Sequence, residues 1–448
     1  MIRYTLTAAS TTGRAEGVKT RGDPISMRMD VQRAKLSGRL GAGILAALTA
    51  ALLAACSTGG GTGSAPTAAL APAPGLSQGQ IRAPVKIALL LPLAGMGETA
   101  TVAKGMKQGA EMALFELNDP NVELITKDDG GTAPGARAAA DAAIKEGAEI
   151  IIGPLLADAV TGVAPVARTA NVPVLAFSNN MQVAGNGIYL LSFLAEQETE
   201  RIVSYAASQG KRRFAALIPD NAYGAVVEAA FRHAVERHGG MISALERYPV
   251  TANGMLAPAK RIVESVKTAE AAMAPVDALF LPGGQESLPQ IGPVIAYSGL
   301  DTTKVKLLGT SAWDYPAAGR ERALVGGWYP SPDPVAWRAF SERFAKTFGT
   351  APPRIASVAY DAVGLAIGLA SNAPGARYTQ ANLTRPSGFT GVDGIVRFQP
   401  NGLSERGLAI LEVQPFGSAV VEPAPGSFEA TKISAADQTQ TGSIPAAN

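Results

Sequence analysis

The feature that most constrains the fold is an alternation of apolar runs and alanine-rich segments that begins after Pro84. Residues 85–93 (VKIALLLPL) form a continuous apolar run, which is typical of a strand buried on both faces. Further strands are expected at residues 122–129, 148–155, 172–178, 212–220, 276–284 and 305–311. Helices are expected at residues 104–117, 136–147, 158–170 and 223–240. This alternation predicts an α/β fold of parallel sheets covered by helices on both faces.

The length of the chain favours two such sheets. At 448 residues it is too long for a single sheet of this kind, so we expect two doubly wound lobes. Ligands of these sheets bind at the carboxyl ends of the strands, beside helix N-termini. In a two-lobed protein those ends face each other across an interlobe cleft, and closure by a hinge motion is expected.

Composition excludes several classes of function. The net charge is only +2, which argues against a protein that binds nucleic acid through a basic surface. Cys56 is the only cysteine, so the chain cannot form an internal disulfide. The two histidines, His233 and His238, are five residues apart and fall on different faces of a helix. No metal site and no cofactor are therefore predicted.

The sequence also lacks the motifs of common enzyme classes. There is no G-x-S-x-G elbow, no H-E-x-x-H pair and no phosphate-binding loop. Glu196, Glu198 and Glu200 are spaced as on a solvated helix face. We therefore expect a binding protein without catalytic residues, not an enzyme.

The N-terminal region has the pattern of a secretory signal peptide. Residues 40–55 (LGAGILAALTAALLAA) form an uncharged apolar run that follows three basic residues. The run is short for a membrane-spanning helix, which needs about 20 residues. The predicted signal covers residues 1–55, and a start at Met27 or Met29 would give it an ordinary length.

The signal ends at the single cysteine. The run Leu53-Ala54-Ala55-Cys56 resembles the lipobox of bacterial lipoproteins, which implies lipidation of Cys56 and cleavage just before it. An ordinary signal with an incidental cysteine is the alternative. Residues 56–83, rich in Gly, Ser, Thr, Ala and Pro, are expected to form a flexible lipidated tether. Residues 427–448 are expected to form a disordered tail.

Several segments in a fixed order resemble the type I periplasmic binding proteins, in the branch of the leucine/isoleucine/valine-binding proteins of ABC importers. They are IALLLPLAGMGETATVAKGMKQGAEMALFELN, the run from KDDGG to FSNN, PDNAYG, VAYDAVGLA and FTGVDGIVRFQPNG. The resemblance implies crossovers between the lobes near residues 190–193, 327–330 and 391–396. Lobe one would then comprise residues 84–192 plus 330–391, and lobe two residues 193–329 plus 392–426.

In lobe one, the resemblance implies two ligand-binding loops. The first is GPLLADAV, where Ala157 replaces the serine that the family usually carries. Asp158 follows as a ligand contact or, in the favoured interpretation, as the N-cap of the next helix. In the second loop, Ser178 and Asn180 match positions of a backbone contact and a hydroxyl contact, although both residues could instead stabilise their own turn.

In lobe two, the resemblance places Tyr223 at the mouth of the cleft, where it would stack on a ligand or pack. Ser311 occupies the position of the glutamate that binds a ligand ammonium in the family. Asp314 could substitute for that glutamate, and Trp313 would form an aromatic wall or buried packing. Two contacts of the usual amino-acid site are thus changed.

Two functions follow from these observations. The first is a lipid-anchored, periplasm-facing protein that delivers amino acids or related small polar ligands to an inner-membrane ABC permease. The body also resembles the C-terminal domain of penicillin-binding protein activators, which implies contact with a peptidoglycan synthase instead. Ser57 after the cysteine favours an outer-membrane anchor over an inner one in a diderm cell. The usual state of the family is a monomer.

Overall fold

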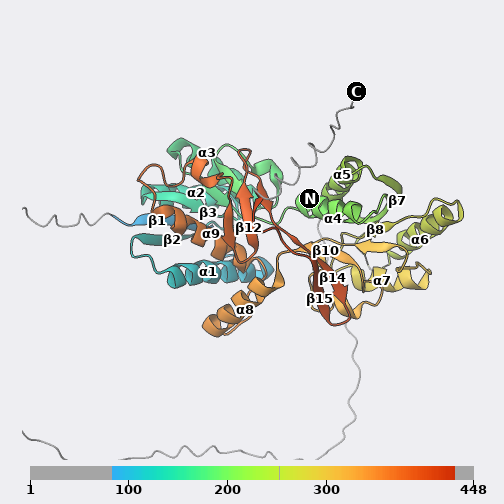
Figure 1. The fold of residues 1–448 in the computed structure, drawn as a ribbon. Helices are drawn as coiled ribbons and strands as arrows, with labels where there is room; N and C mark the ends of the chain where they lie inside the picture. The colour runs from blue at the N-terminus through green and yellow to red at the C-terminus, as the bar shows by residue number, and fades with distance from the viewer. Residues whose placement is uncertain (1–82, 252, 429–448) are drawn as a thin grey trace, which may run out of the picture. The chain divides into compact units, whose positions relative to one another are not determined.

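The computed structural model describes residues 83–251 and 253–428, and it confirms the predicted α/β class with parallel sheets (Figure 1). Cys56, the predicted signal peptide, nearly all of the tether and most of the tail lie outside the described residues. None of the helices in the described part is both long enough and apolar enough to cross a membrane.

The first sheet is five-stranded, in the order β2-β1-β3-β4-β5, and all its pairs are parallel. Its strands are β1 Val85–Leu91, β2 Val122–Asp128, β3 Ala148–Ile152, β4 Val174–Ala176 and β5 Ile188–Leu190. The associated helices are α1 Gly97–Leu117, α2 Ala133–Lys145, α3 Ala157–Ala170, α8 Pro334–Phe348, α9 Ala356–Ala370 and α10 Gln380–Leu383, with a 3-10 turn η1 at Met181–Val183.

Alternate residues of β1 pack into different cores on the two faces of this sheet. Ile87 and Leu89 contact the core formed with α1 and α9, whereas Ala88 and Leu90 contact the core formed with α2 and α3. Because successive side chains of a strand point to opposite faces, a continuous apolar run is required where both faces are covered. Figure 1 shows α1 and α9 on one side of the sheet and α2 and α3 on the other.

The second sheet is seven-stranded, in the order β15-β14-β10-β9-β8-β6-β7. Its strands are β6 Arg213–Pro219, β7 Met241–Tyr248, β8 Ala278–Phe280, β9 Lys306–Leu308, β10 Trp328–Ser331, β14 Ala409–Gln414 and β15 Gly417–Glu422, of which β14 and β15 run antiparallel to their neighbours. Its helices are α4 Ala195–Ser208, α5 Ala222–Arg237, α6 Leu256–Ala271 and α7 Leu288–Tyr297, with 3-10 turns η2 Ser311–Trp313 and η3 Ala318–Arg320. Helices α4 and α5 cover one face, and α6 and α7 the other.

A third, antiparallel sheet consists of β11 Phe389–Gly391, β12 Gly394–Phe398 and β13 Ser404–Arg406. The chain passes from the first sheet to the second between β5 and α4, and it leaves the second sheet after β10 to form α8 and α9. It returns through the third sheet to β14. Three connections therefore join the elements of the two large sheets.

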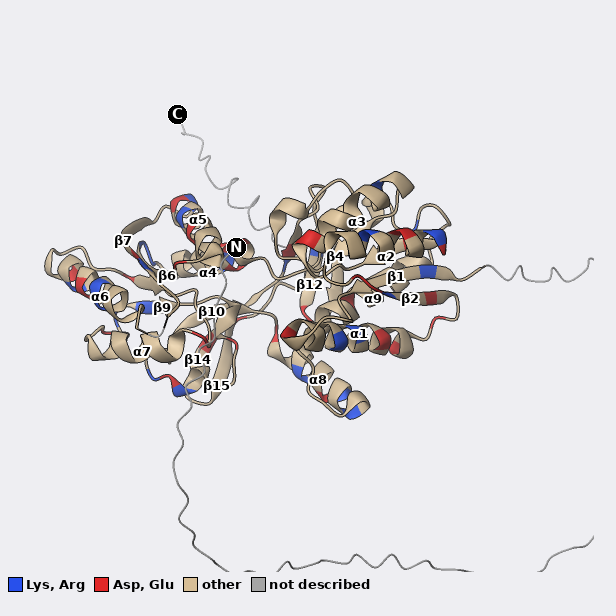
Figure 2. Ribbon diagram, turned by 180° about the vertical axis from the view of Figure 1, so that it is seen from behind, with Lys and Arg blue, Asp and Glu red and all other residues tan. Residues whose placement is uncertain are grey.

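Charges of both signs are interspersed on the helices, as Figure 2 shows for α2, α5 and α6. Many form local pairs, such as Lys145 with Asp141 on α2 and Arg232 with Glu228 on α5. Positive and negative charges are therefore close together on these three helices.

Candidate functional site

The candidate site lies in the loops that follow the carboxyl ends of the parallel strands, which we call the ligand-facing edges of the first and second sheets. At the first edge, Asp128 orders the loop after β1: its two carboxylate oxygens accept hydrogen bonds from the N–H groups of Leu93 (2.8 Å) and Ala94 (3.2 Å). The loop is therefore held by a side chain from the neighbouring strand β2.

Ala157 and Asp158 lie at the beginning of α3, which Ala157 starts. The interpretation of Asp158 as the N-cap is wrong, because Leu156 occupies that position and no side chain caps the helix. Asp158 lies exposed in the first turn, where a carboxylate is favoured by the helix dipole. With alanine at position 157, the backbone N–H groups are the donors that this loop offers.

Ser178 and Asn180 are both engaged in their own turn. The Ser178 hydroxyl oxygen accepts a hydrogen bond from the N–H of Asn180 (3.2 Å), and the Asn180 side chain accepts one from Gln182 (3.0 Å), which caps η1. Ser178 is buried and Asn180 is exposed. The hydroxyl proton of Ser178 and the amide N–H groups of Asn180 make no hydrogen bond to another described residue, so both side chains still have a donor to offer.

Asp129, directly after β2, is a buried acid that sequence reasoning did not single out. Its side chain is fully buried, with Oδ1 accepting a hydrogen bond from Gly131 (2.8 Å). Oδ2 has no hydrogen-bond partner among the described residues. Burial raises the pKa of Asp129 to about 6, with a smaller contribution from the charge of Asp128. The group is therefore protonated over a wider pH range than an ordinary aspartate.

At the second edge, Tyr223 stands in the first turn of α5. It is 37% exposed, and its hydroxyl contacts the carbonyl of Pro282 (3.1 Å) and the hydroxyl of Thr310 (3.2 Å). These contacts fix the ring over the ends of β8 and β9, with part of it accessible. Burial of the hydroxyl raises the pKa of Tyr223, so the group remains neutral.

An acid, Glu198, lies beside Ser311 at the start of η2. The carboxylate of Glu198 accepts hydrogen bonds from the Ser311 hydroxyl (2.6 Å) and from its backbone N–H (3.1 Å). Glu198 is only 5% exposed, so the expectation that it lies on a solvated face is wrong. The acid that position 311 lacks is thus supplied by α4.

The environment of Glu198 explains how a carboxylate can be buried there. Burial raises its pKa, while the hydrogen bonds from Ser311 and the positive charges of Arg406 and Arg354 oppose that rise. No ion pair to Glu198 is formed within the described part of the chain. The carboxylate therefore lacks a direct counter-charge, which a cationic ligand group would provide.

Trp313 does not form the cleft wall considered for it, whereas Asp314 is exposed at the end of the same 3-10 turn. Trp313 is fully buried, and its indole N–H donates to the carbonyl of Leu281 (2.9 Å). The side chain of Asp314 accepts a hydrogen bond from the hydroxyl of Ser331 (3.1 Å) at the end of β10. Trp313 is thus core packing, and Asp314 braces the second connection.

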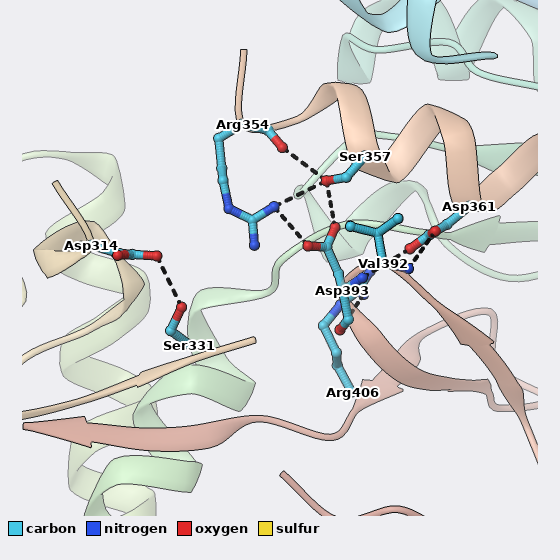
Figure 3. A network of polar contacts seen from close by, with 8 residues as sticks. All are labelled: Asp314, Ser331, Arg354, Ser357, Asp361, Val392, Asp393 and Arg406. Carbon is cyan, nitrogen blue, oxygen red and sulfur yellow. Dashed lines mark hydrogen bonds and ion pairs between the residues drawn. The ribbon is translucent and has the colours of Figure 1, made fainter. Parts of the chain in front are cut away.

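A buried polar network, shown in Figure 3 and called here the Asp393 network, holds the third connection. Arg354, before α9, pairs with Asp393 (2.7 Å), whose other oxygen accepts from the Ser357 hydroxyl (2.7 Å). The carboxylate of Asp361 accepts from the N–H groups of Val392 (2.7 Å) and Asp393 (3.2 Å). The N-terminal half of α9 is thereby bonded to the turn between β11 and β12.

Arg406 completes this network from β13. It donates to the carbonyl of Asp393 (3.3 Å), and its guanidinium lies 4.6 Å from the ring centroid of Phe193. Its Nε and Nη2 have no hydrogen-bond partner among the described residues. Burial and the nearby charge of Asp393 raise the pKa of Asp361 to about 7. Phe193, Ser331 and Asp393 lie at or beside the three connections, each in contact with a polar or charged side chain.

The described residues contain no group of three or more His, Cys, Asp or Glu side chains placed to hold a metal ion. The chemistry that the two edges offer is hydrogen bonding by hydroxyl, amide and backbone N–H groups at one edge, and a carboxylate with a tyrosine at the other. This combination suits a ligand that carries a carboxylate and an ammonium group.

Comparisons of the sequence and of the fold with known proteins point to the same kind of protein. The family described as periplasmic binding protein matches residues 84–417. Leu/Ile/Val-binding protein homolog 6 of Brucella melitensis is 26% identical over 255 residues, which are 54% of this chain and 62% of that protein. The chain thus spans less than two thirds of the length of that relative.

Solved structures share the fold. One is a branched-chain amino acid ABC transporter periplasmic ligand-binding protein from Burkholderia xenovorans, with a TM-score of 0.61, 18% identity and coverage of 76% of this chain and 96% of that one. Another is an ABC transporter substrate-binding protein from Desulfitobacterium hafniense in complex with Leu, with a TM-score of 0.55, 19% identity and coverage of 75% and 99%.

Proposed function

Because the chain belongs to the periplasmic binding protein family, we propose that it is the lipid-anchored substrate-binding component of an ABC-type importer for amino acids or related small polar ligands. Family membership implies a location in the periplasm or cell envelope. The proteins it resembles are substrate-binding proteins of ABC transporters rather than enzymes, which confirms the expectation that the chain is not an enzyme.

The observation that carries the proposal is the pairing of Glu198 with Ser311. A ligand ammonium would be received by the Glu198 carboxylate, which is fixed by two hydrogen bonds and lacks a direct counter-charge. The partly exposed ring of Tyr223 would cover the ligand from the same edge. An acid held in place before binding loses little entropy when the ligand arrives.

The carboxylate of the ligand would bind at the edge of the first sheet. The donors there are the backbone N–H groups at the N-terminus of α3, the hydroxyl of Ser178 and the amide of Asn180. Asp158 would repel an anionic group placed directly over it, so the ligand carboxylate would lie closer to Ser178. We propose that the ligand is held between the two edges and that closure is recognised by an inner-membrane permease.

A thermal-shift panel tests this function. Free amino acids, their amides and muropeptides are added to the purified mature chain, because a ligand that binds only the folded state raises the melting temperature. A rise with one or more amino acids that grows with concentration supports the proposal. The absence of any rise, together with capture of a peptidoglycan synthase by the same chain, would instead support the activator function.

The activator function is the second candidate, and one observation favours it. Ala157 and Ser311 both lack the side chains that the amino-acid-binding members use. A body of this fold with an altered site would serve as a docking surface for a synthase. Glu198 weighs against this alternative, since it restores an acid beside Ser311.

The anchor is proposed from the sequence around Cys56. Lipidation would hold the chain at a membrane, with the outer membrane favoured over the inner one in a diderm cell because Ser57 follows the cysteine. Replacement of Cys56 by alanine should release the exported chain from the membrane fraction into the soluble envelope fraction. Retention of the variant in the membrane fraction would contradict the lipid anchor.

A further inference from the structure

A pocket of about 630 Å³ lies at the amino ends of β3, β4 and β5 in the first sheet. Its floor is formed by residues such as Ala148 and Ile188, where these strands begin, and one side is formed by Gly375 and residues 377–380, which lead into α10. The ligand-facing edge lies at the other end of the same strands, roughly 16 Å away for a five-residue strand. The pocket is therefore separate from the candidate site. Its volume lies within the range typical of small-molecule sites.

Two nearly buried side chains bring unpartnered donors to this pocket. The ring of Tyr189 packs against Phe398, and the residue is 4% exposed, yet its hydroxyl makes no hydrogen bond to another described residue. Arg377 is 8% exposed; its Nε donates to the carbonyl of Ala370 and its Nη1 to both oxygens of Glu149. Within residues 83–251 and 253–428, nothing accepts a hydrogen bond from its Nη2. The two residues are nearly buried, but neither of these two donor atoms is itself fully buried, so both remain accessible from the pocket.

The pocket carries one uncompensated positive charge. The charged residues of its lining are Glu149, Arg168 and Arg377, and Glu149 is already neutralised by Arg377 (2.7 Å). The Nε of Arg168 donates to the carbonyl of Asn186 (3.2 Å), and the guanidinium forms no ion pair with the described part of the chain. An anionic group would thus gain a guanidinium partner without displacing an existing ion pair.

The remaining lining is mixed: Val172, Pro173 and Ile188 are apolar, whereas Asn171, Asn186, Thr379 and Gln380 are polar. We propose that this pocket binds a small molecule that carries a carboxylate on a compact apolar body, independently of the ligand-facing edges. The carboxylate is held by Arg168, the free Nη2 of Arg377 and the hydroxyl of Tyr189. The apolar body packs against the strand ends.

Methyl NMR of the mature chain with phenylacetate as the probe tests the pocket. We expect phenylacetate to shift the methyl signals of Val172 and Ile188 saturably, and its neutral analogue phenylacetamide to bind at least ten-fold more weakly. Arg168→Gln and Tyr189→Phe should each weaken phenylacetate binding at least five-fold and leave the rest of the spectrum unchanged. Arg377 is left intact because its ion pair contributes to the fold.

The matched control is Arg137→Gln. Arg137 is an exposed arginine on α2, which packs on the same sheet, and it lies outside the pocket. It should leave phenylacetate binding unchanged. The inference is overturned if phenylacetamide binds as well as phenylacetate, if Arg137→Gln has the effect of Arg168→Gln, or if the shifts are absent or confined to the ligand-facing edge around Leu156.

Discussion

Glu198 and Ser311 are 113 residues apart in the chain, yet the carboxylate of Glu198 accepts hydrogen bonds from both the hydroxyl and the backbone N–H of Ser311. The contact joins the first turn of α4 to the loop after β9. It puts an acid beside position 311, where the loop itself carries a serine. In the proposed function, this acid makes the second edge able to receive a ligand cation.

Glu198→Gln therefore separates the charge of this side chain from its hydrogen bonds. The amide can still accept from the Ser311 N–H and donate to its hydroxyl, so the loop should keep its conformation. Affinity for an ammonium-bearing ligand should fall about ten- to a hundred-fold, because a hydrogen bond to a charged group contributes about 1.5–3 kcal/mol. Titration calorimetry measures the loss. Glu196→Gln, on the same turn, is the control and should bind as the wild type does.

Asp129 predicts a pH dependence of stability. The carboxyl group of Asp129 keeps its proton up to a pH of about 6 in the folded chain, whereas it loses the proton near pH 3.8 in the unfolded chain. Folding therefore takes up a proton at pH values between 3.8 and about 6. The contribution of Asp129 to the free energy of unfolding is fully present below pH 3.8 and is lost as the pH rises through about 6. At neutral pH, Asp129→Asn should be more stable than the wild type, by at most about 3 kcal/mol for a shift of this size.

Urea unfolding at pH 4 and pH 7 measures this effect. The difference between Asp129→Asn and the wild type should grow with pH across this interval. Asp141→Asn, an acid on the outer face of α2, provides the control. A difference that is the same at both pH values would contradict the assignment of the raised pKa to Asp129.

Gly309 is required by the packing of Trp313. A Cβ at this position would lie 2.3 Å from the indole ring, so Gly309→Ala must displace the fully buried Trp313. We expect a loss of stability of about 1–3 kcal/mol, typical of overpacking, and a red shift of tryptophan fluorescence. A Cβ at Gly368, on α9, would have no atom within 4 Å. Gly368→Ala should therefore leave the free energy of unfolding unchanged or raise it by about 0.5–1 kcal/mol. Equal effects of the two substitutions would refute this role of the ring.

Ser357 predicts how much the Asp393 network contributes. Its hydroxyl is fully buried, donates to Asp393 and accepts from Arg354. Ser357→Ala leaves an oxygen of a buried carboxylate without its donor, which should cost about 1–3 kcal/mol of unfolding free energy. The control is Ser371→Ala at the exposed end of α9. If denaturant midpoints of the two variants coincide, the network does not stabilise the connection.

Much of the fold was predictable because the pattern of apolar residues that marks strands and helices depends only on neighbouring positions in the sequence. The apolar run that begins at Val85 predicted a strand covered on both faces, and β1 packs into two cores. Strands with shorter or more polar sequences, such as β7 and β10, were not singled out. β7 lies at the edge of its sheet and has exposed residues, so it carries little of the apolar signal of a central strand.

The candidate site was less predictable, since it depends on contacts between distant segments. Glu196, Glu198 and Glu200 look alike in sequence, and only the position of α4 against the loop after β9 distinguishes Glu198. The role of Trp313 was also not predictable from its residue type, which allows either a cleft wall or core packing. The absence of a side chain at Gly309 leaves room for the indole ring in the core. For Asp129 the sequence carries one indication, an acid at the end of an expected strand and before two glycines.

The most direct test of the proposed function is calorimetric titration of the mature chain with amino acids and two analogue series, one lacking the carboxylate and one lacking the ammonium group. The proposed function predicts that at least one amino acid binds once per chain, and that removal of either charged group weakens binding at least ten-fold. Binding of the deaminated analogue as tightly as the amino acid, or no binding by any amino acid, would contradict it.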